Sequence, residues 1–252
     1  MHSLKDMPGN EETPYLVIGA YLKRGNVSDC LVLRGDRNES DLLSSSSLSP
    51  LWIGTTSVRR SAFLRRIYPG CESIHFRGAV VGSEKSRLHK LDNRLKQETE
   101  EGGVVGPADA LVLAVSGLTR VGQNARISRE FTIDEMLPAV GQGIVAVECR
   151  ADDFSTLQLL STIDHLDTRQ CALAERELLW ILNGHCNSPI AGTCVVQDGA
   201  LRLRAAVMSL DGMTILETES VGDFGRPREL GRTVAFELLH KGADKLIEDS
   251  RI

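Results

Sequence analysis

Aromatic residues are scarce in this chain of 252 residues, since Trp, Tyr and Phe together make up 4% of it. Such a small share argues against the stacking platforms on which proteins bind single-stranded nucleic acid. The longest apolar runs, such as 110–115 and 144–147, are far too short to span a bilayer. No charged-then-apolar leader opens the chain. We therefore expect a cytoplasmic protein that acts on a small molecule, with no nucleic acid or membrane partner.

Motifs for metals, nucleotides and activated serines are also missing. The histidines show neither H-x-x-x-H nor Cys/His ligand spacing, so we expect no metal site. There is no G-x-x-x-x-G-K loop, no G-x-G-x-x-G after a strand and no G-x-S-x-G elbow. The cysteines form no C-x-x-C pair and are typical of reduced cytosolic thiols. They are Cys30, Cys71, Cys149, Cys171, Cys186 and Cys194.

Positive charge is concentrated in one segment, although the whole chain has a net charge of −5. Residues 57–96 contain ten Lys and Arg against three acids, so this segment carries +7 and the remainder −12. A local basic field inside an acidic protein suits a small polyanionic ligand better than a long nucleic acid. The alternative is that these side chains lie on solvated helix faces.

Strands alternate with helices through the first two thirds of the chain, which predicts an α/β body with a mainly parallel sheet. A serine-rich loop at 41–50 interrupts this pattern, and Ser57 is a suitable N-cap for the helix that follows. The expected strands are 14–22, 31–34, 51–54, 108–115 and 144–149, and the expected helices are 57–68, 86–97, 155–163 and 168–182.

The last third has a different pattern. Apolar residues alternate over 191–196, 201–208 and 214–220, and Asp-Gly pairs separate these runs. Asp-Gly between alternating runs is a strong hairpin signal, so these strands are expected to be antiparallel. An amphipathic helix over 227–249 completes a small α+β domain.

Arginines follow predicted strand ends: Arg59 and Arg60 come after 51–54, and Arg120 comes after 108–115. In α/β sheets, ligands bind at the carboxyl ends of strands. A guanidinium group binds a carboxylate in a bidentate way, and each charged hydrogen bond contributes about 1.5–3 kcal/mol. Because no phosphate loop is present, these arginines predict a ligand with several carboxylates.

Cys186 lies in a loop among Gly, Asn, Ser and Pro, which leaves a thiol accessible, and the neighbouring His185 can favour its thiolate form. The alternative is a half-buried structural cysteine.

Asp6 follows Lys5 in a dense polar segment. A carboxylate beside an ammonium group stays ionised at neutral pH, so it can stabilise a developing cation or relay a proton. The alternative is a surface ion pair.

Eight motifs, taken in order, resemble the porphobilinogen deaminase (hydroxymethylbilane synthase) family. Each is weak alone, but together they extend over nearly the whole chain. They are HSLKDMP (2–8), GTTSVRR (54–60), FRG (76–78), SRLHKLD (86–92), SGLTRVG (116–122), PAVGQG (138–143), VECR (147–150) and GHCNSPIAG (184–192).

The resemblance implies a role for each matching residue. Cys186 matches the cysteine that carries a dipyrromethane cofactor through a thioether, and Asp6 matches the catalytic aspartate that stabilises the cationic azafulvene. The implied reaction adds porphobilinogen four times, releases ammonia each time, and ends with hydrolysis to hydroxymethylbilane. The positions that match binding sites for acetate and propionate side chains are Ser3, Lys5, Ser57, Arg59, Arg60, Arg77, Arg87 and Arg120.

The implied fold is α/β, with two periplasmic-binding-protein-like (type II) α/β domains around a cleft and a small C-terminal α+β domain. The first domain, which is incomplete, would hold 1–24 and 142–163, the second 25–141, and the third 164–252. Residues 141–143 would form a tight turn at a hinge crossing. We expect a monomer for the full-length protein.

The chain departs from the family pattern in two places. Family members carry a strand–helix–strand–helix run ahead of the first motif, and without it the first domain is expected to expose apolar surface. They also have RGN followed closely by TRL, whereas here about four extra residues separate Arg77 from Arg87 and the asparagine is replaced by Ala79. The alternatives to an active transferase are an inactive fragment of the same fold and a reversible anion-sensing domain.

Overall fold

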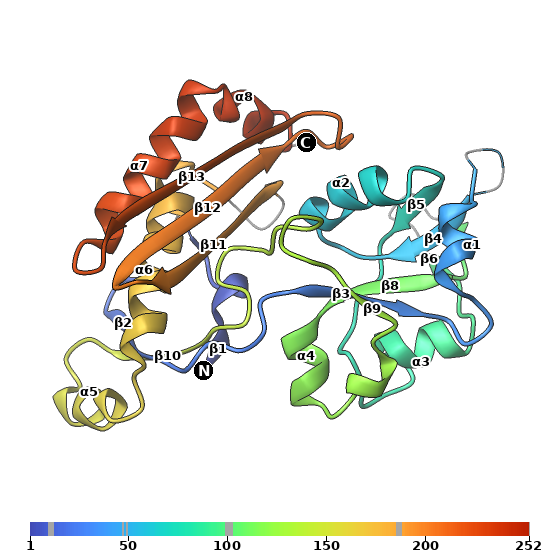
Figure 1. The fold of residues 1–252 in the computed structure, drawn as a ribbon. Coiled ribbons are helices and arrows are strands. Elements are labelled where there is room, and N and C mark those ends of the chain that lie inside the picture. Colours follow the sequence, from blue (N-terminus) through green and yellow to red (C-terminus); the bar gives the residue numbers. More distant parts are fainter. Residues whose placement is uncertain (10–12, 47, 49, 99–102, 185–187, 252) are drawn as a thin grey trace. The chain divides into compact units, whose positions relative to one another are not determined.

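The computed structural model describes residues 1–9, 13–46, 48, 50–98, 103–184 and 188–251 (Figure 1). The chain divides into two compact units. Unit 1 contains 1–27, 137–209 and 214–252, and unit 2 contains 28–136 and 210–213. Each unit combines helices and strands, so the expected mixed α/β class is confirmed. Within the described part of the chain, no helix is both long and apolar enough to cross a membrane.

Unit 2 is built on a five-stranded sheet in the order β5-β4-β8-β3-β9. β4 pairs with β5 and β8 in parallel, whereas β3 pairs with β8 and β9 antiparallel. The prediction of a mainly parallel sheet is therefore wrong, because alternation of strands and helices does not fix the direction in which β3 and β9 run. The bounds are β3 (Asp29–Leu33), β4 (Leu51–Gly54), β5 (Cys71–Ile74), β8 (Ala110–Ala114) and β9 (Arg129–Glu130).

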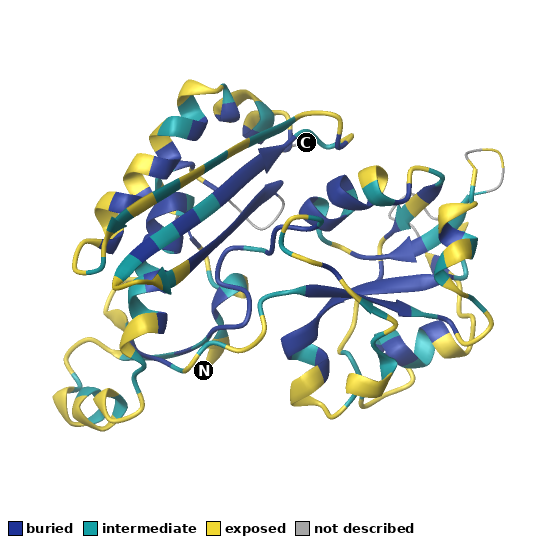
Figure 2. Ribbon diagram, in the orientation of Figure 1, coloured by how far each residue is buried: buried dark blue, intermediate teal, exposed yellow. Residues whose placement is uncertain are grey.

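Short helices accompany this sheet, and its central strands are buried (Figure 2). The helix expected over 86–97 ends at Asp92, because Arg94 adopts a left-handed φ of 54° that a helix cannot contain. Residues 41–43, at the start of the expected serine-rich loop, are helical instead, in a helix that Asn38 caps. The remaining elements of unit 2 are α1 (Glu39–Leu43), α2 (Val58–Ile67), α3 (Arg87–Asp92), α4 (Val115–Arg120), η2 (Asn124–Arg126), β6 (Gln97–Glu98) and β7 (Val104–Val105).

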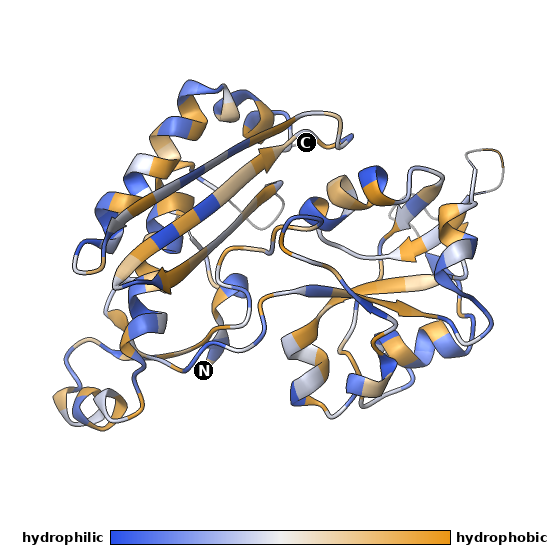
Figure 3. Cartoon of the chain, in the orientation of Figure 1, coloured by the Kyte–Doolittle hydropathy of each residue, from blue (hydrophilic) through white to orange (hydrophobic). Residues whose placement is uncertain are grey.

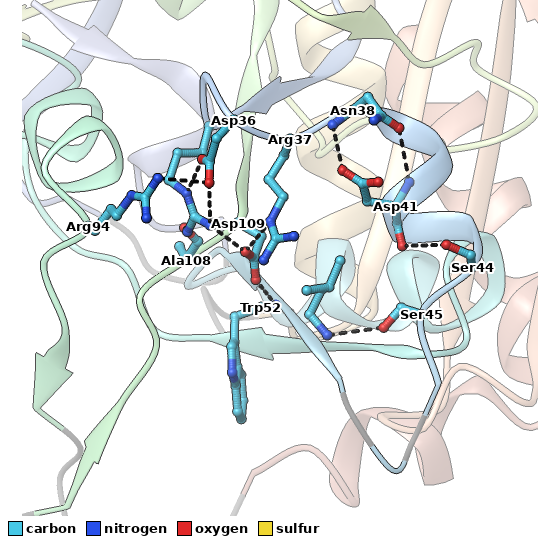
Figure 4. Close-up of polar contacts among 12 residues, drawn as sticks. Asp36, Arg37, Asn38, Asp41, Ser44, Ser45, Trp52, Arg94, Ala108 and Asp109 are labelled. Atoms are coloured by element: carbon cyan, nitrogen blue, oxygen red, sulfur yellow. Dashed lines mark hydrogen bonds and ion pairs between the residues drawn. The ribbon is translucent and has the colours of Figure 1, made fainter.

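One edge of the sheet is held by a polar cluster around Asp109 (Figure 4). Its Oδ1 accepts hydrogen bonds from Arg34 Nη2 at 2.9 Å and Arg37 Nε at 2.8 Å. Its Oδ2 accepts the backbone N–H of Trp52 at 2.9 Å. The Asp109 carboxylate thus joins the end of β3 to the starts of β4 and β8.

Unit 1 contains two antiparallel sheets, and the first has the order β1-β10-β2. Large apolar side chains are exposed beside it: Tyr15 is 88% exposed, and Phe154 and Leu159 on the adjacent α5 are 77% and 71% exposed. Exposed apolar surface was expected here. The elements are β1 (His2–Ser3), η1 (Leu4–Asp6), β2 (Leu16–Tyr21), β10 (Val145–Arg150) and α5 (Phe154–Ser161).

The second sheet of unit 1 has the order β11-β12-β13, and its antiparallel pairing confirms the hairpin prediction. Asp198 and Gly199 both have positive φ at the first turn, as a type I′ hairpin requires. Apolar side chains of the sheet pack against α6 and α7 in one core. Figure 3 colours the hydrophobic residues of these elements orange. The helix expected over 227–249 breaks at Gly242, which has a φ of 90°. The elements are α6 (Leu166–Ile181), β11 (Ile190–Gln197), β12 (Ala200–Met208), β13 (Ile215–Asp223), α7 (Pro227–His240) and α8 (Ala243–Glu248).

The glycine turn before β10 leaves no room for a side chain. Gly143 has a φ of 84°, and a Cβ atom there would lie 2.8 Å from the carbonyl oxygen of Gly25. We expect Gly143→Ala to lower the free energy of unfolding of unit 1 by about 2–3 kcal/mol, from strain and a backbone clash together. Gly199→Ala is the control, because its φ is 77° with nothing within 4 Å, so it should cost only about 1 kcal/mol. Equal losses of unfolding free energy in the two variants, measured by urea unfolding, would contradict the predicted clash with Gly25.

Candidate functional site

The segment that carries Asp6 is fixed by backbone pairing with β10. His2 and Ser3 pair with Ala146 and Val145, and the Leu4 N–H donates to the Ile144 carbonyl at 3.0 Å. Leu4 is buried, whereas Asp6, at the other end of the same short helix, is exposed. Among the described residues, no hydrogen bond or ion pair to the Asp6 carboxylate is found. A ligand can therefore approach this carboxylate directly.

Lys5 is held by a residue that sequence patterns did not single out. Its Nζ donates to Gln142 Oε1 at 3.2 Å. Gln142 is fully buried, its Nε2 donates to the Val27 carbonyl at 2.7 Å, and its own carbonyl accepts from Arg24 Nε at 2.9 Å. The sequence indicated only a Gly-Gln-Gly turn at this point. A polar side chain between two glycines was the available signal.

In unit 2, Ser57, Arg59 and Arg60 lie at the start of α2, immediately after β4. The Ser57 hydroxyl accepts the Arg60 N–H at 3.4 Å, which confirms the predicted N-cap. Arg59 and Arg60 are 3% and 7% exposed, so the alternative that they lie on a solvated helix face is wrong for these two residues. Both guanidinium groups contact the buried carboxylate of Asp29.

Strand direction explains why Asp29 meets these arginines. β4 is parallel to β8, so the carboxyl ends of both lie at one sheet edge. β3 is antiparallel to β8, so its first residue, Asp29, lies at that same edge and pairs with Ala114. Asp29 opens an apolar strand in the sequence, and a charge in that position was the signal that sequence analysis missed.

The other candidate arginines are more dispersed. Arg77 follows the neighbouring strand β5, is exposed, and lines a cavity of about 660 Å³ with Trp52, His75 and Lys90. Arg87 is the half-buried first residue of α3. Arg120 is the exposed last residue of α4, which begins directly after β8.

Cys186 lies outside the described residues. The described chain on either side places the segment between α6 and β11, with Gly184 donating its N–H to the Leu179 carbonyl at 2.9 Å. Within the described part of the chain, no group of three or more His, Cys, Asp or Glu side chains could hold a metal ion.

The two buried arginines lie at a strand-end edge of unit 2 and the exposed Asp6 carboxylate lies in unit 1, both within a mixed α/β protein. The family model described as "porphobilinogen deaminase, dipyromethane cofactor binding domain" matches residues 1–158. The model described as "porphobilinogen deaminase, C-terminal domain" matches residues 169–240. The chain belongs to the porphobilinogen deaminase family, a family of transferases, and the resemblance of its motifs is confirmed.

Curated relatives are similar over almost the whole chain. The porphobilinogen deaminase of Coxiella burnetii (strain RSA 493 / Nine Mile phase I) is 36% identical over 250 residues, which cover 99% of this chain and 73% of that protein. The porphobilinogen deaminase of Desulforudis audaxviator is 39% identical over 248 residues, covering 98% and 73%. That of Xanthomonas euvesicatoria is 39% identical over 251 residues, covering 99% and 75%.

Proposed function

We propose that this chain condenses four porphobilinogen molecules stepwise, releases ammonia at each step, and yields hydroxymethylbilane. The observation that carries this proposal is the buried tandem of Arg59 and Arg60 around Asp29, in a chain of the porphobilinogen deaminase family. Two guanidinium groups against one carboxylate leave an excess of positive charge. Such a site favours the carboxylate side chains that porphobilinogen carries.

The described residues also fit the dipyrromethane group that the family model names. That group carries acidic side chains, and the buried arginines at the carboxyl edge of the unit 2 sheet provide guanidinium donors for them. When bound, dipyrromethane supplies the anchored pyrrole chain to which each new unit is joined. We propose that Cys186 holds it through a thioether.

Asp6 is the proposed catalytic residue. Its exposed carboxylate can stabilise the positive charge that develops on a pyrrole as ammonia leaves. Lys5, which precedes Asp6 in the chain, donates from its Nζ to Gln142. Its ammonium group can also bind a carboxylate of the substrate. The further proposed binding residues are Ser3, Ser57, Arg59, Arg60, Arg77, Arg87 and Arg120.

For the architecture, we propose the type II periplasmic-binding-protein arrangement in two α/β domains, 1–24 with 142–163 and 25–141, followed by an α+β domain at 164–252. The mixed five-stranded sheet supports the domain at 25–141, and the antiparallel sheet β11-β12-β13 with its helices supports the α+β domain at 164–252. We further propose that the protein acts as a cytoplasmic monomer without nucleic acid or membrane partners.

Intact mass tests cofactor attachment. After incubation with porphobilinogen, the wild-type chain is expected to gain the mass of two linked pyrrole units, and Cys186→Ser is expected to gain none, because the sulfur that forms the thioether is gone. Cys149→Ser is the control, since Cys149 is half-buried on β10 and has no proposed role. An unmodified wild-type mass, or an adduct that persists in Cys186→Ser, would refute the proposed attachment.

A further inference from the structure

Asp29 is more deeply buried than either arginine that it contacts. It is the first residue of β3 and is fully buried. Its Oδ2 accepts from Arg59 Nη2 at 2.5 Å. Its Oδ1 accepts from Arg60 Nε at 3.1 Å and Nη2 at 2.7 Å. Both carboxylate oxygens are therefore engaged, one by each member of the tandem.

Arg60 is fixed on two sides by the sheet. Besides its two bonds to Asp29, its Nη1 donates to the Val112 carbonyl on β8 at 3.0 Å. All three guanidinium nitrogens of Arg60 thus bind the protein itself. A side chain with several rotatable bonds is thereby held in one position, which lowers the entropy that ligand binding must still remove.

The thiol next to Asp29 adds no charge to this cluster. Burial raises the pKa of the adjacent Cys30 thiol to about 12, and the Asp29 carboxylate acts in the same direction, so this thiol is neutral at pH 7 and adds no negative charge. Burial lowers the pKa of Arg59, Asp29 opposes this shift, and Arg60 adds to it. An anion placed beside the tandem would relieve the repulsion between the two guanidinium groups.

We propose that Asp29 is a positioning residue for substrate binding: its buried carboxylate orients Arg59 and Arg60 at the carboxyl edge of the unit 2 sheet while leaving the pair cationic for an acidic side chain of porphobilinogen. This inference rests on the proposed function. It assigns Asp29 no contact with the substrate; Asp29 acts through the arginines.

Asp109 provides a matched control in the same unit. It is also a buried aspartate whose Oδ1 accepts from two arginines, Arg34 and Arg37. It differs in position, because it lies at the start of β8, whereas Asp29 lies beside the end of that strand. Asp109→Asn should therefore disturb the fold as Asp29→Asn does, but not substrate binding.

The experiment compares Asp29→Asn and Asp109→Asn, each made in the 252-residue chain, with the wild type. The measurements are thermal unfolding, the steady-state constants for porphobilinogen, and equilibrium binding of porphobilinogen by calorimetry. We expect both variants to lower Tm. Only Asp29→Asn should raise KM and the dissociation constant, by about tenfold, with kcat changed less than about threefold, because positioned binding groups are lost while Asp6 is untouched.

An unchanged KM and dissociation constant in Asp29→Asn, or an equal rise in Asp109→Asn, would overturn the positioning role. If Asp29→Asn fails to fold, Asp29→Glu serves instead, because it keeps the charge and moves it by one methylene. Positioning predicts a raised dissociation constant for Asp29→Glu, and a wild-type value would refute it. Loss of the proposed function has a different signature, since the wild type itself would then release no ammonia, while calorimetry would still compare Asp29→Asn with it.

Discussion

Asp6→Asn is expected to reduce ammonia release by about 10²- to 10³-fold, which corresponds to a loss of about 3–4 kcal/mol of transition-state stabilisation. The amide has nearly the shape of the carboxylate but no charge, so it cannot stabilise a cation forming on the pyrrole. The fold should be unaffected, because Asp6 is exposed and its neighbour Leu4 supplies the buried contact of this segment. Turnover is measured at saturating porphobilinogen on protein already loaded with cofactor.

The control for Asp6→Asn is Asp152→Asn. Asp152 is also an exposed aspartate of unit 1, and its replacement removes the same charge. We expect Asp152→Asn to retain wild-type turnover. Wild-type turnover in Asp6→Asn would eliminate Asp6 as the catalytic residue, and a comparable loss in both variants would point to net charge rather than to position.

Local signals were sufficient for much of the fold. Asp-Gly pairs predicted the antiparallel hairpins, and at Asp198-Gly199 both residues have the positive φ of a tight turn whose twist matches the strands. Ser57 predicted the start of α2, since its hydroxyl can satisfy an N–H of the first helical turn. These features depend on residues a few positions apart, and sequence spacing reports such contacts directly.

Long-range contacts could not be predicted in the same way. Asp29 lies 30 residues before Arg59, and Lys5 lies 137 residues before Gln142. Nothing in the local sequence of either residue identifies its partner, which depends on strand order and direction. The motif comparison indicated Arg59 and Arg60 as anion-binding residues, but only the direction of β3 in the mixed sheet places the Asp29 carboxylate against their guanidinium groups.

Glu175 shows how such a contact supports unit 1. It lies on α6 in a sequence with other charged residues, yet it is fully buried. Its Oε1 accepts from Arg24 Nη1 at 2.5 Å and from the Cys194 N–H at 2.7 Å. Its Oε2 accepts from Arg24 Nη2 at 3.2 Å and from the Gly141 N–H at 2.6 Å. One carboxylate thus joins α6, β11, the glycine turn and the chain after β2.

Glu175→Ala should lower the free energy of unfolding of unit 1 by about 3–5 kcal/mol, because it leaves a mostly buried guanidinium group and two buried N–H groups without their acceptor. Trp52 and Trp180 are the two tryptophans of the chain, and they lie in different units. A Trp52→Phe background therefore lets Trp180 fluorescence report urea unfolding of unit 1 alone.

The control for Glu175→Ala is Glu177→Ala on the same helix. Glu177 binds Arg228 and Arg232, whose side chains are 59% and 53% exposed, so water can replace the lost acceptor and the expected cost is only about 1 kcal/mol. Equal losses of unfolding free energy in Glu175→Ala and Glu177→Ala would mean that the exposure of the partner arginines to water does not decide the cost. A larger cost for Glu175→Ala would show that the stability of unit 1 depends on a carboxylate whose partner Arg24 is 151 residues away in the chain.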